Sequence, residues 1–239
     1  MIRVGVLGAA GRMGTEACRV IERDPELELV ARVGRGEPLA ALSEAGADVA
    51  VELTTPDSVV DNVRFCLTHG IHCVVGTTGM TDDDLEDVRR WCREGGANAF
   101  VAPNFALGAV LMMVFARQAA PHFDSVEIVE RHHARKADAP SGTSLRTARL
   151  VNEARGARAA TGGDDPSRGR DEGGVRIHSV RLPGSVAHQE VLFGSEGETL
   201  TIRHDTIDRT SFMPGVLLAV KRVSGLDGLV VGLEHLLDL

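Results

Sequence analysis

The sequence predicts an α/β protein, with a doubly wound parallel sheet in the first part of the chain and a second, α+β domain on a mixed sheet. In the first part, short apolar runs alternate with helical patterns, which is typical of βαβ units. In the second part, apolar and polar residues alternate along successive runs, which favours antiparallel or mixed strands. We expect one domain at 1–104, with 216–239 packing back on it, and another at 105–215.

The elements of the first domain follow from apolar runs and helical periodicity. The expected strands are 4–7, 27–33, 49–53, 72–75 and 99–102, and the expected helices are 12–23, 58–69 and 82–94. Thr81 precedes the last helix and is a suitable N-cap. Because the carboxyl ends of parallel strands lie at one edge of a sheet, we expect ligand-binding loops there.

The second domain begins with a long apolar segment. We expect a buried helix at 106–120, strands at 125–131, 175–182, 187–193 and 199–204, and a loop at 161–174 rich in Gly, Asp and Arg. Val191, Phe193, Leu200 and Ile202 are expected to share one face of the sheet. The segment 215–239 starts as an apolar helix.

Composition excludes several classes of protein. The 239 residues carry a formal net charge of -8 without a long basic block, so a nucleic-acid partner is not expected. The chain has neither a signal-peptide pattern nor an apolar run long enough to span a membrane, so we expect a cytoplasmic protein. Cys18, Cys66, Cys73 and Cys92 lack metal-type spacing, and we interpret them as core residues rather than a redox pair.

A glycine-rich turn joins the first expected strand to the first helix. Gly8, Gly11 and Gly14 form the pattern, with Arg12 and Met13 inside it. Glycines let the backbone approach a pyrophosphate, and the helix N-terminus offers amides to it. This position predicts a dinucleotide site, although tight strand-to-helix packing would also explain glycine, particularly at Gly14.

The loop after the second strand bears on the choice between NADH and NADPH. A site for NADH usually places an acidic residue there to bind the ribose hydroxyls. This chain has Gly34 and Arg35 at that point, and Glu37 comes later. Arg35 is therefore a candidate for binding the 2′-phosphate of NADPH. A solvated loop residue without a ligand would explain Arg35 equally well.

Two further loops follow expected strands of the first domain. The residues Gly76, Thr77 and Thr78 follow the fourth strand, and Ala102, Pro103, Asn104 and Phe105 follow the fifth. Both loops are expected at the ligand-binding edge, where they would border the nicotinamide and its ribose. Simple turns would explain these residues too.

A basic run ends the strand at 125–131. His132, His133, Arg135 and Lys136 concentrate positive charge, and Lys136 is one of only two lysines in the chain. The segment 138–143 then opens a helix, with Pro140 expected in its first turn. The amides of Gly142 and Thr143 would point at an anion, and a dicarboxylate fits best.

Bland interpretations of the basic run remain open. A solvated basic turn would explain the charges without a ligand. Adjacent histidines also invite a metal, but only Glu130 and Asp138 lie nearby as further ligands, so no metal site is expected. A histidine near its ordinary pKa moves protons at neutral pH, and a lysine can bind a carboxylate.

Taken in order, these motifs resemble those of the dihydrodipicolinate reductase family, also called 4-hydroxy-tetrahydrodipicolinate reductases. The resemblance rests on the glycine turn, on 76–79, on 102–105, on the block from Glu130 to Thr143 and on the run 187–194. It covers essentially the whole chain. It implies a Rossmann-like cofactor domain, a substrate domain on a mixed sheet, and a homotetramer assembled through that sheet.

The same resemblance implies roles for individual residues. A cyclic dicarboxylate would be reduced with hydride from NADH or NADPH, in diaminopimelate and lysine biosynthesis. His132 would give or take the proton, and Lys136 would be the second acid-base residue. His133, Lys136, Gly142 and Thr143 would hold the carboxylates, whereas the motifs of the first domain would border the cofactor.

The chain departs from the family at two positions. Gly34 stands where the family has an acidic residue, which leaves the cofactor preference open, and Arg135 stands where relatives often have another His. Two other functions remain as alternatives: a related reductase acting on another small dicarboxylate, and a nucleotide sensor without catalytic activity.

Overall fold

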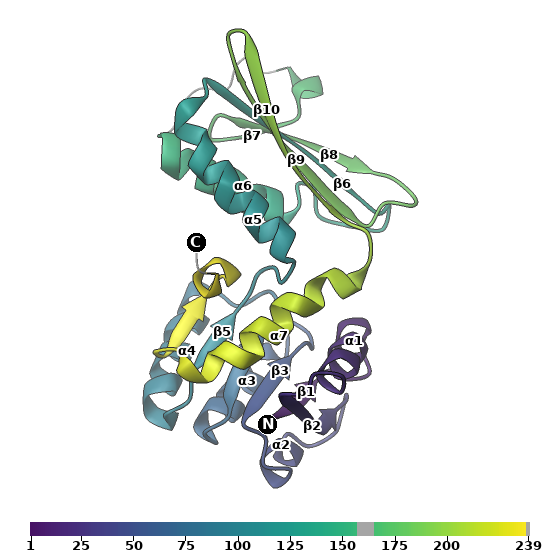
Figure 1. The fold of residues 1–239 in the computed structure, drawn as a ribbon, viewed down its shortest axis with the longest axis vertical. Coiled ribbons are helices and arrows are strands. Elements are labelled where there is room, and N and C mark those ends of the chain that lie inside the picture. The colour runs from purple at the N-terminus through teal and green to yellow at the C-terminus, as the bar shows by residue number, and fades with distance from the viewer. Residues whose placement is uncertain (157–164, 238–239) are drawn as a thin grey trace. The chain divides into compact units, whose positions relative to one another are not determined.

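The computed structural model describes residues 1–156 and 165–237. The chain divides into two compact units, which are drawn in Figure 1. Unit 1 comprises Met1–Leu107 and Arg209–Leu239, and unit 2 comprises Gly108–Asp208. Each unit has its own sheet.

Unit 1 contains a six-stranded parallel sheet with the strand order β11-β5-β4-β3-β1-β2. Its strands are β1 (Ile2–Leu7), β2 (Leu27–Val33), β3 (Val49–Glu52), β4 (His72–Val75), β5 (Ala99–Val101) and β11 (Leu229–Val231). Its α-helices are α1 (Arg12–Ile21), α2 (Ala40–Glu44), α3 (Val59–Thr68), α4 (Asp82–Gly95) and α7 (Met213–Arg222), and its 3-10 helices are η3 (Arg209–Phe212), η4 (Val223–Gly225) and η5 (Leu233–Leu236). The predicted doubly wound sheet is confirmed.

Helices pack on this sheet in pairs. Helix α3 contacts α4, β3 and β4, whereas α1 contacts α7 and β1 (Figure 1). Two short elements were not predicted, the five-residue helix α2 and the three-residue strand β11. Both are too short to show a periodic pattern, and β11 forms because it pairs with β5.

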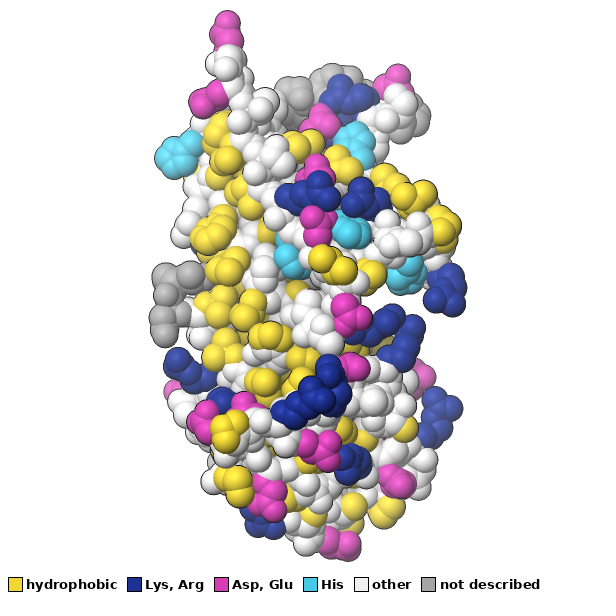
Figure 2. Space-filling model, turned by 45° about the vertical axis from the view of Figure 1, so that its right-hand side comes forward, with side chains coloured by type: hydrophobic (Ala, Val, Ile, Leu, Met, Phe, Trp, Pro, Cys, Tyr) yellow, Lys and Arg dark blue, Asp and Glu magenta, His cyan; other side chains and the backbone are white. Residues whose placement is uncertain are grey.

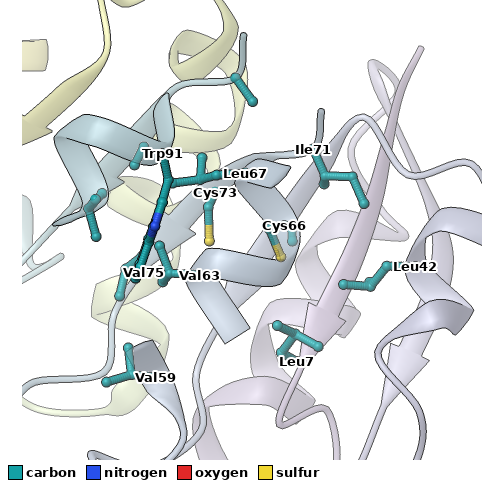
Figure 3. Packing of buried hydrophobic residues seen from close by; sticks show 14 of the residues in the cluster. Leu7, Leu42, Val59, Val63, Cys66, Leu67, Ile71, Cys73, Val75 and Trp91 are labelled. Atoms are coloured by element: carbon teal, nitrogen blue, oxygen red, sulfur yellow. The ribbon is translucent and has the colours of Figure 1, made fainter. Parts of the chain in front are cut away.

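The core of unit 1 is aliphatic with few aromatic residues. Leu7, Leu67, Val75 and Trp91 belong to one buried cluster, drawn in Figure 3. Cys66, Cys73 and Cys92 lie in the same cluster, and all four cysteines of the chain are buried and free. Burial raises the pKa of the Cys92 thiol, and a hydrogen bond with Cys66, together with burial, raises that of Cys73. The interpretation of the cysteines as core residues is confirmed.

Unit 2 contains a five-stranded mixed sheet with the order β10-β9-β6-β8-β7. Its strands are β6 (Ser125–His132), β7 (Arg170–Glu172), β8 (Val175–Arg181), β9 (Ala187–Ser195) and β10 (Glu198–Thr206). Its helices are α5 (Leu107–Ala119), which begins at the unit boundary, α6 (Gly142–Arg155), η1 (Ala120–His122) and η2 (Pro166–Arg168). Strands β6 and β8 are parallel, whereas β9 is antiparallel to β6 and β10. The predicted mixed sheet is confirmed.

Register places the expected apolar residues of β9 and β10 on one face, because Leu200 pairs with Phe193 and Ile202 with Val191. Two other expectations for unit 2 are corrected. Helix α5 is buried along one side only, and Phe115 is exposed. The segment 161–174, expected as a loop, contains η2 and the edge strand β7, while 161–164 lies outside the described residues.

The surface carries charges of both signs. On the face drawn in Figure 2, dark-blue basic side chains lie among magenta acidic ones. Within the part of the chain that the structure describes, no helix is both long and apolar enough to cross a membrane.

Helix α4 begins with a capping box, as the N-cap position of Thr81 predicted. The Thr81 hydroxyl accepts a hydrogen bond from the Asp84 amide at 3.2 Å, and the Asp84 carboxylate accepts one from the Thr81 amide at 2.7 Å. These contacts satisfy two amides that the helix itself leaves without acceptors.

Replacing Thr81 by Ala removes this cap, so we expect the free energy of unfolding to fall by about 1 kcal/mol. Urea unfolding followed by circular dichroism measures the change. Thr68→Ala is the control, because the exposed Thr68 hydroxyl contacts only its own helix and the adjacent His69 ring and caps no amide. Equal losses in both variants would show that the cap contributes nothing specific.

Candidate active site

The turn between β1 and α1 needs its glycines for different reasons. Gly8 has φ +77°, a conformation that side chains disfavour, and its carbonyl accepts a hydrogen bond from the Gly11 amide at 2.9 Å. A Cβ atom at Gly14 would lie 2.1 Å from the Gly8 carbonyl oxygen, so Gly14 permits close strand-to-helix packing, as expected. Gly11 is the N-cap of α1 and offers no capping side chain. Arg12 and Met13 form the first turn of α1.

A pocket of about 530 Å³ opens beside this turn within unit 1. That volume lies in the range of small-molecule and cofactor sites. Its lining comes from the glycine turn, the loop after β2, the end of β3 and the start of α3: Leu7, Gly8, Ala10, Gly11, Val33, Gly34, Arg35, Gly36, Glu37, Leu39, Leu53, Thr54, Thr55, Ser58 and Asn62. The structure thus brings together Gly8, Gly11, Gly34 and Arg35, four of the residues predicted to bind the cofactor.

The loop after β2 differs from the interpretation of the sequence. Residues 34–37 form a tight turn in which the Glu37 amide donates to the Gly34 carbonyl at 3.3 Å, and Gly36 has φ +82°. The Glu37 carboxylate folds back and accepts a hydrogen bond from the Gly34 amide. An acidic group is therefore present at the end of β2, although it belongs to a residue three positions later.

A network of buried polar side chains lies beside the pocket and includes residues that line it. The Glu52 side chain is 0% exposed and one of its carboxylate oxygens accepts hydrogen bonds from the Thr54 hydroxyl and from Asn62 Nδ2, the latter at 3.1 Å. Asn62 Nδ2 also donates to the Thr54 hydroxyl at 3.1 Å. Since Thr54 and Asn62 line the pocket, this network holds the end of β3 against α3. Sequence reasoning missed it because isolated polar residues give no local signal.

The loops after β4 and β5 meet within unit 1. A Cβ atom at Gly76 would lie 2.8 Å from the Phe105 ring and 2.7 Å from Leu53, so Gly76 allows these groups to approach. Thr77 Oγ1 is buried without a hydrogen-bond partner among the described residues, which suits a hydroxyl that binds a ligand. Asn104 Oδ1 accepts from the Ala106 amide at 2.8 Å, just before α5.

The other predicted cofactor residues of these loops do not line the pocket beside the glycine turn. Thr78 and Pro103 are exposed, and Ala102 is buried with its amide bonded to the Val75 carbonyl at 3.0 Å. Arg12, Met13 and Gly14 likewise lie outside the lining of that pocket.

In unit 2 the basic run is organised by a carboxylate that the sequence analysis considered only as a metal ligand. Glu130 is 0% exposed, and its side chain lies on the same face of β6 as that of His132, two residues later. His132 Nδ1 pairs with one Glu130 oxygen. Arg181 of β8 donates to both Glu130 oxygens, at 2.9 and 2.8 Å. A buried negative charge is thereby compensated by two side chains from neighbouring strands.

Burial by itself raises the pKa of Glu130, but the hydrogen bonds from His132 and Arg181 outweigh it and lower that pKa to about 2. Glu130 is therefore an anion at every physiological pH. An ionised Glu130 acts as the acceptor for His132 Nδ1, which leaves the other ring nitrogen to exchange a proton elsewhere.

Helix α6 begins beside this cluster. Ser141 is its N-cap, and the Ser141 amide donates to Glu130 Oε1 at 3.3 Å. The expectation that Pro140 would lie in the first turn is wrong, because Pro140 precedes the N-cap. Gly142 and Thr143 are the first two residues of the helix, at the end where the helix dipole favours an anion. Glu130 thus links the predicted proton-transfer residue to the predicted anion-binding amides.

A buried polar chain holds the start of α6 on the sheet. The Ser141 hydroxyl accepts from the Ser144 amide at 3.2 Å, and the Ser144 hydroxyl donates to Gln189 Oε1 at 2.8 Å. Gln189 Nε2 then donates to the Thr147 hydroxyl at 2.7 Å. Because Gln189 belongs to β9, the run 187–194 contributes to the site by positioning α6.

The segment between β6 and α6 carries the remaining basic residues. Lys136 Nζ pairs with Asp138 Oδ1 at 2.8 Å, and the Lys136 side chain is 22% exposed. The Asp138 carbonyl accepts from Arg181 at 2.6 Å, so Arg181 ties this segment to Glu130. Arg135 is exposed, whereas His133 is half-buried. Among the described residues, no group of three or more His, Cys, Asp or Glu side chains is arranged to hold a metal ion.

Two family models match consecutive parts of the chain. The model described as dihydrodipicolinate reductase, N-terminus, matches residues 2–105, and the model described as dihydrodipicolinate reductase, C-terminus, matches residues 108–237. The chain belongs to the dihydrodipicolinate reductase family. The resemblance inferred from the motifs is confirmed, and with it the prediction of a pyridine-nucleotide-dependent oxidoreductase.

Individual members of the dihydrodipicolinate reductase family match over their whole length. The 4-hydroxy-tetrahydrodipicolinate reductase of Streptomyces coelicolor is 56% identical over 246 residues, covering 100% of this chain and 98% of the relative. That of Mycolicibacterium smegmatis is 54% identical, with 100% of both chains covered. The solved structure of dipicolinate-bound dihydrodipicolinate reductase from Paenisporosarcina sp. TG-14 superposes with a TM-score of 0.90 at 39% identity, covering 99% of this chain and 100% of that one.

The low pKa of Glu130 makes a prediction about stability and pH. The unfolded chain protonates this carboxyl near pH 4.5, whereas the native state keeps it ionised until about pH 2. Glu130 therefore contributes on the order of 3 kcal/mol to the free energy of unfolding above pH 4.5, and this contribution is lost as pH falls toward 2.

Urea unfolding of the wild type and of Glu130→Gln at pH 7, 5, 4 and 3 measures this contribution. We expect the difference between the two proteins to be largest at pH 7 and 5 and to shrink at pH 4 and 3. A difference that does not vary with pH would contradict the assignment of Glu130 as a buried anion.

Proposed function

We propose that this chain catalyses the NADH- or NADPH-dependent reduction of 4-hydroxy-tetrahydrodipicolinate to tetrahydrodipicolinate, a step of diaminopimelate and lysine biosynthesis. The observation that carries the proposal is the Glu130–His132–Arg181 cluster at the start of α6. It joins a proton-transfer group to a set of anion-binding groups within one unit. The dipicolinate bound by the Paenisporosarcina relative is a small cyclic dicarboxylate of the same kind.

Unit 1 is proposed to bind the cofactor. The pocket beside the glycine turn has a size that suits an adenosine moiety, and the amides at the start of α1 would bind the pyrophosphate. Gly76, Thr77, Thr78 and Ala102 to Phe105 would border the nicotinamide and its ribose, where the buried Thr77 hydroxyl gains a partner. The bound nicotinamide supplies the hydride.

Unit 2 is proposed to hold the substrate and manage the proton. The amides of Gly142 and Thr143, with His133 and Lys136, would bind the two carboxylates, because helix N-termini and cations both favour anions. His132 would deliver the proton. Glu130 and Arg181 would act as positioning residues, since Glu130 pairs with the His132 ring and Arg181 holds Glu130.

The same resemblance leads us to propose a cytoplasmic homotetramer assembled through the mixed sheet of unit 2. Helix α6 packs on β6, β7 and β8 of this sheet. The ion pairs Glu127–His178 and His188–Asp205 join side chains of neighbouring strands in the same sheet. Sedimentation equilibrium is expected to give a mass about four times the 25.4 kDa of one chain. A stable monomer at micromolar concentration would contradict this assembly.

Activity is tested by supplying fresh substrate from a dihydrodipicolinate synthase and following nicotinamide oxidation at 340 nm. We expect the wild type to oxidise NADH or NADPH only when substrate is present. His132→Ala and Lys136→Ala are each expected to lower kcat by roughly a hundredfold or more, the usual loss when acid-base assistance is removed. Arg135→Ala, at an exposed position of the same segment, is the control and is expected to keep its activity.

The same assay distinguishes a positioning role of Glu130 from a purely structural role. Glu130→Gln keeps the shape but not the charge, so we expect kcat to fall more than KM rises and the pH profile of kcat to change. No oxidation of either cofactor by the wild type would reject the reductase and favour a nucleotide sensor. Full turnover in both His132→Ala and Lys136→Ala would place the proton transfer on other residues.

A further inference from the structure

The turn at residues 34–37 places an acidic group where the sequence lacks one. The Gly34 amide donates to the Glu37 carboxylate, and the Glu37 amide donates to the Gly34 carbonyl at 3.3 Å. These two bonds close the turn from both sides. The carboxylate is therefore held by backbone geometry, although the Glu37 side chain comes from an exposed residue.

The position of this carboxylate corresponds to that of a missing side chain. A Cβ atom built on Gly34 would lie 3.3 Å from Glu37 Oε2 and 3.8 Å from Glu37 Cδ. The side chain of an Asp at position 34 would thus begin in contact with the Glu37 carboxylate. Both Gly34 and Glu37 line the pocket beside the glycine turn, next to Gly8 and Gly11.

A carboxylate at this point of an α/β nucleotide site accepts hydrogen bonds from the ribose hydroxyls. One Glu37 oxygen is bonded to the Gly34 amide, and a carboxylate has further lone pairs on both oxygens for a diol. We propose that Glu37 is the residue that binds the adenosine ribose hydroxyls, and that it makes this chain select NADH over NADPH. This inference rests on the proposed cofactor role of unit 1.

Electrostatics favours the same choice. The 2′-phosphate of NADPH would bring about two negative charges next to a carboxylate that the backbone holds in place. Arg35 lines the same pocket and offers a positive charge, but no hydrogen bond to another described residue fixes its side chain, whereas the Gly34 amide fixes the Glu37 carboxylate. Arg35 therefore allows some binding of NADPH without reversing the preference that Glu37 sets.

Equilibrium binding of NADH and NADPH to the full chain, measured by isothermal titration calorimetry without substrate, tests the proposal. Glu37→Gln keeps an acceptor for the Gly34 amide but loses the charge. We expect its Kd for NADH to rise about tenfold, since a charge-assisted hydrogen bond is lost, and its Kd for NADPH to fall. Arg35→Ala is the matched control in the same turn and is expected to weaken NADPH binding only.

A rescue variant makes the test independent of general damage to the turn. Gly34 has no positive φ, so Asp is compatible with its backbone. Adding Gly34→Asp to Glu37→Ala, in which position 37 no longer fills this space, returns a carboxylate next to it and is expected to restore the preference for NADH. Failure of this rescue, with the thermal midpoint unchanged, would overturn the proposal.

The remaining outcomes are also decisive. If Glu37→Gln leaves the ratio of the two Kd values unchanged, or if the wild type binds NADPH more tightly than NADH, Glu37 is not the selecting residue. Because these measurements need no turnover, they stand apart from the reductase assay. A chain that binds NADH through Glu37 but does not reduce the dicarboxylate would sink the proposed reaction and leave this inference intact.

Discussion

The buried carboxylate of Glu130 is the constraint on which the arrangement of unit 2 depends. A buried anion is costly unless hydrogen bonds and opposite charges surround it, and Glu130 obtains these from His132, Arg181 and the Ser141 amide. Its partners come from β6, β8 and the start of α6. Satisfying one charge therefore fixes three chain segments in register, and the same contacts orient the imidazole that is proposed to move the proton.

Strand geometry explains why His132, of all members of the basic run, is the one proposed for that role. Side chains two residues apart share a face of a strand, so His132 lies with Glu130, whereas Arg131 lies on the opposite face. Lys136 lies beyond the end of β6, in the segment that Arg181 holds through the Asp138 carbonyl. The members of the basic run carry similar charges, but they differ in position. Some lie on opposite faces of β6, and others lie beyond the end of that strand.

The sequence predicted those features that depend on local pattern. Periodicity located the strands of the parallel sheet and its longer helices, and Thr81 was recognisable as a cap because capping is decided within four residues. Contacts between distant residues left no such signal. Arg181 reaches Glu130 from 51 positions away, Gln189 reaches Ser144 from 45, and the short strand β11 exists only by pairing with β5. Glu37 was visible, but only the turn at Gly36 shows where its carboxylate lies.

The two proposed sites share one kind of contact, but one site is exposed and the other is buried. In each, a carboxylate accepts a hydrogen bond from a backbone amide, Gly34 for Glu37 and Ser141 for Glu130. Glu37 is exposed, so its charge is exchangeable with modest effect on folding, and the cofactor preference of the loop is free to vary. Glu130 is buried and shared among several partners, so we expect the loss of its charge to affect both the stability of the fold and the proposed proton transfer. Exposure therefore lets the residue at position 37 change at little cost to folding, whereas burial constrains the residue at position 130.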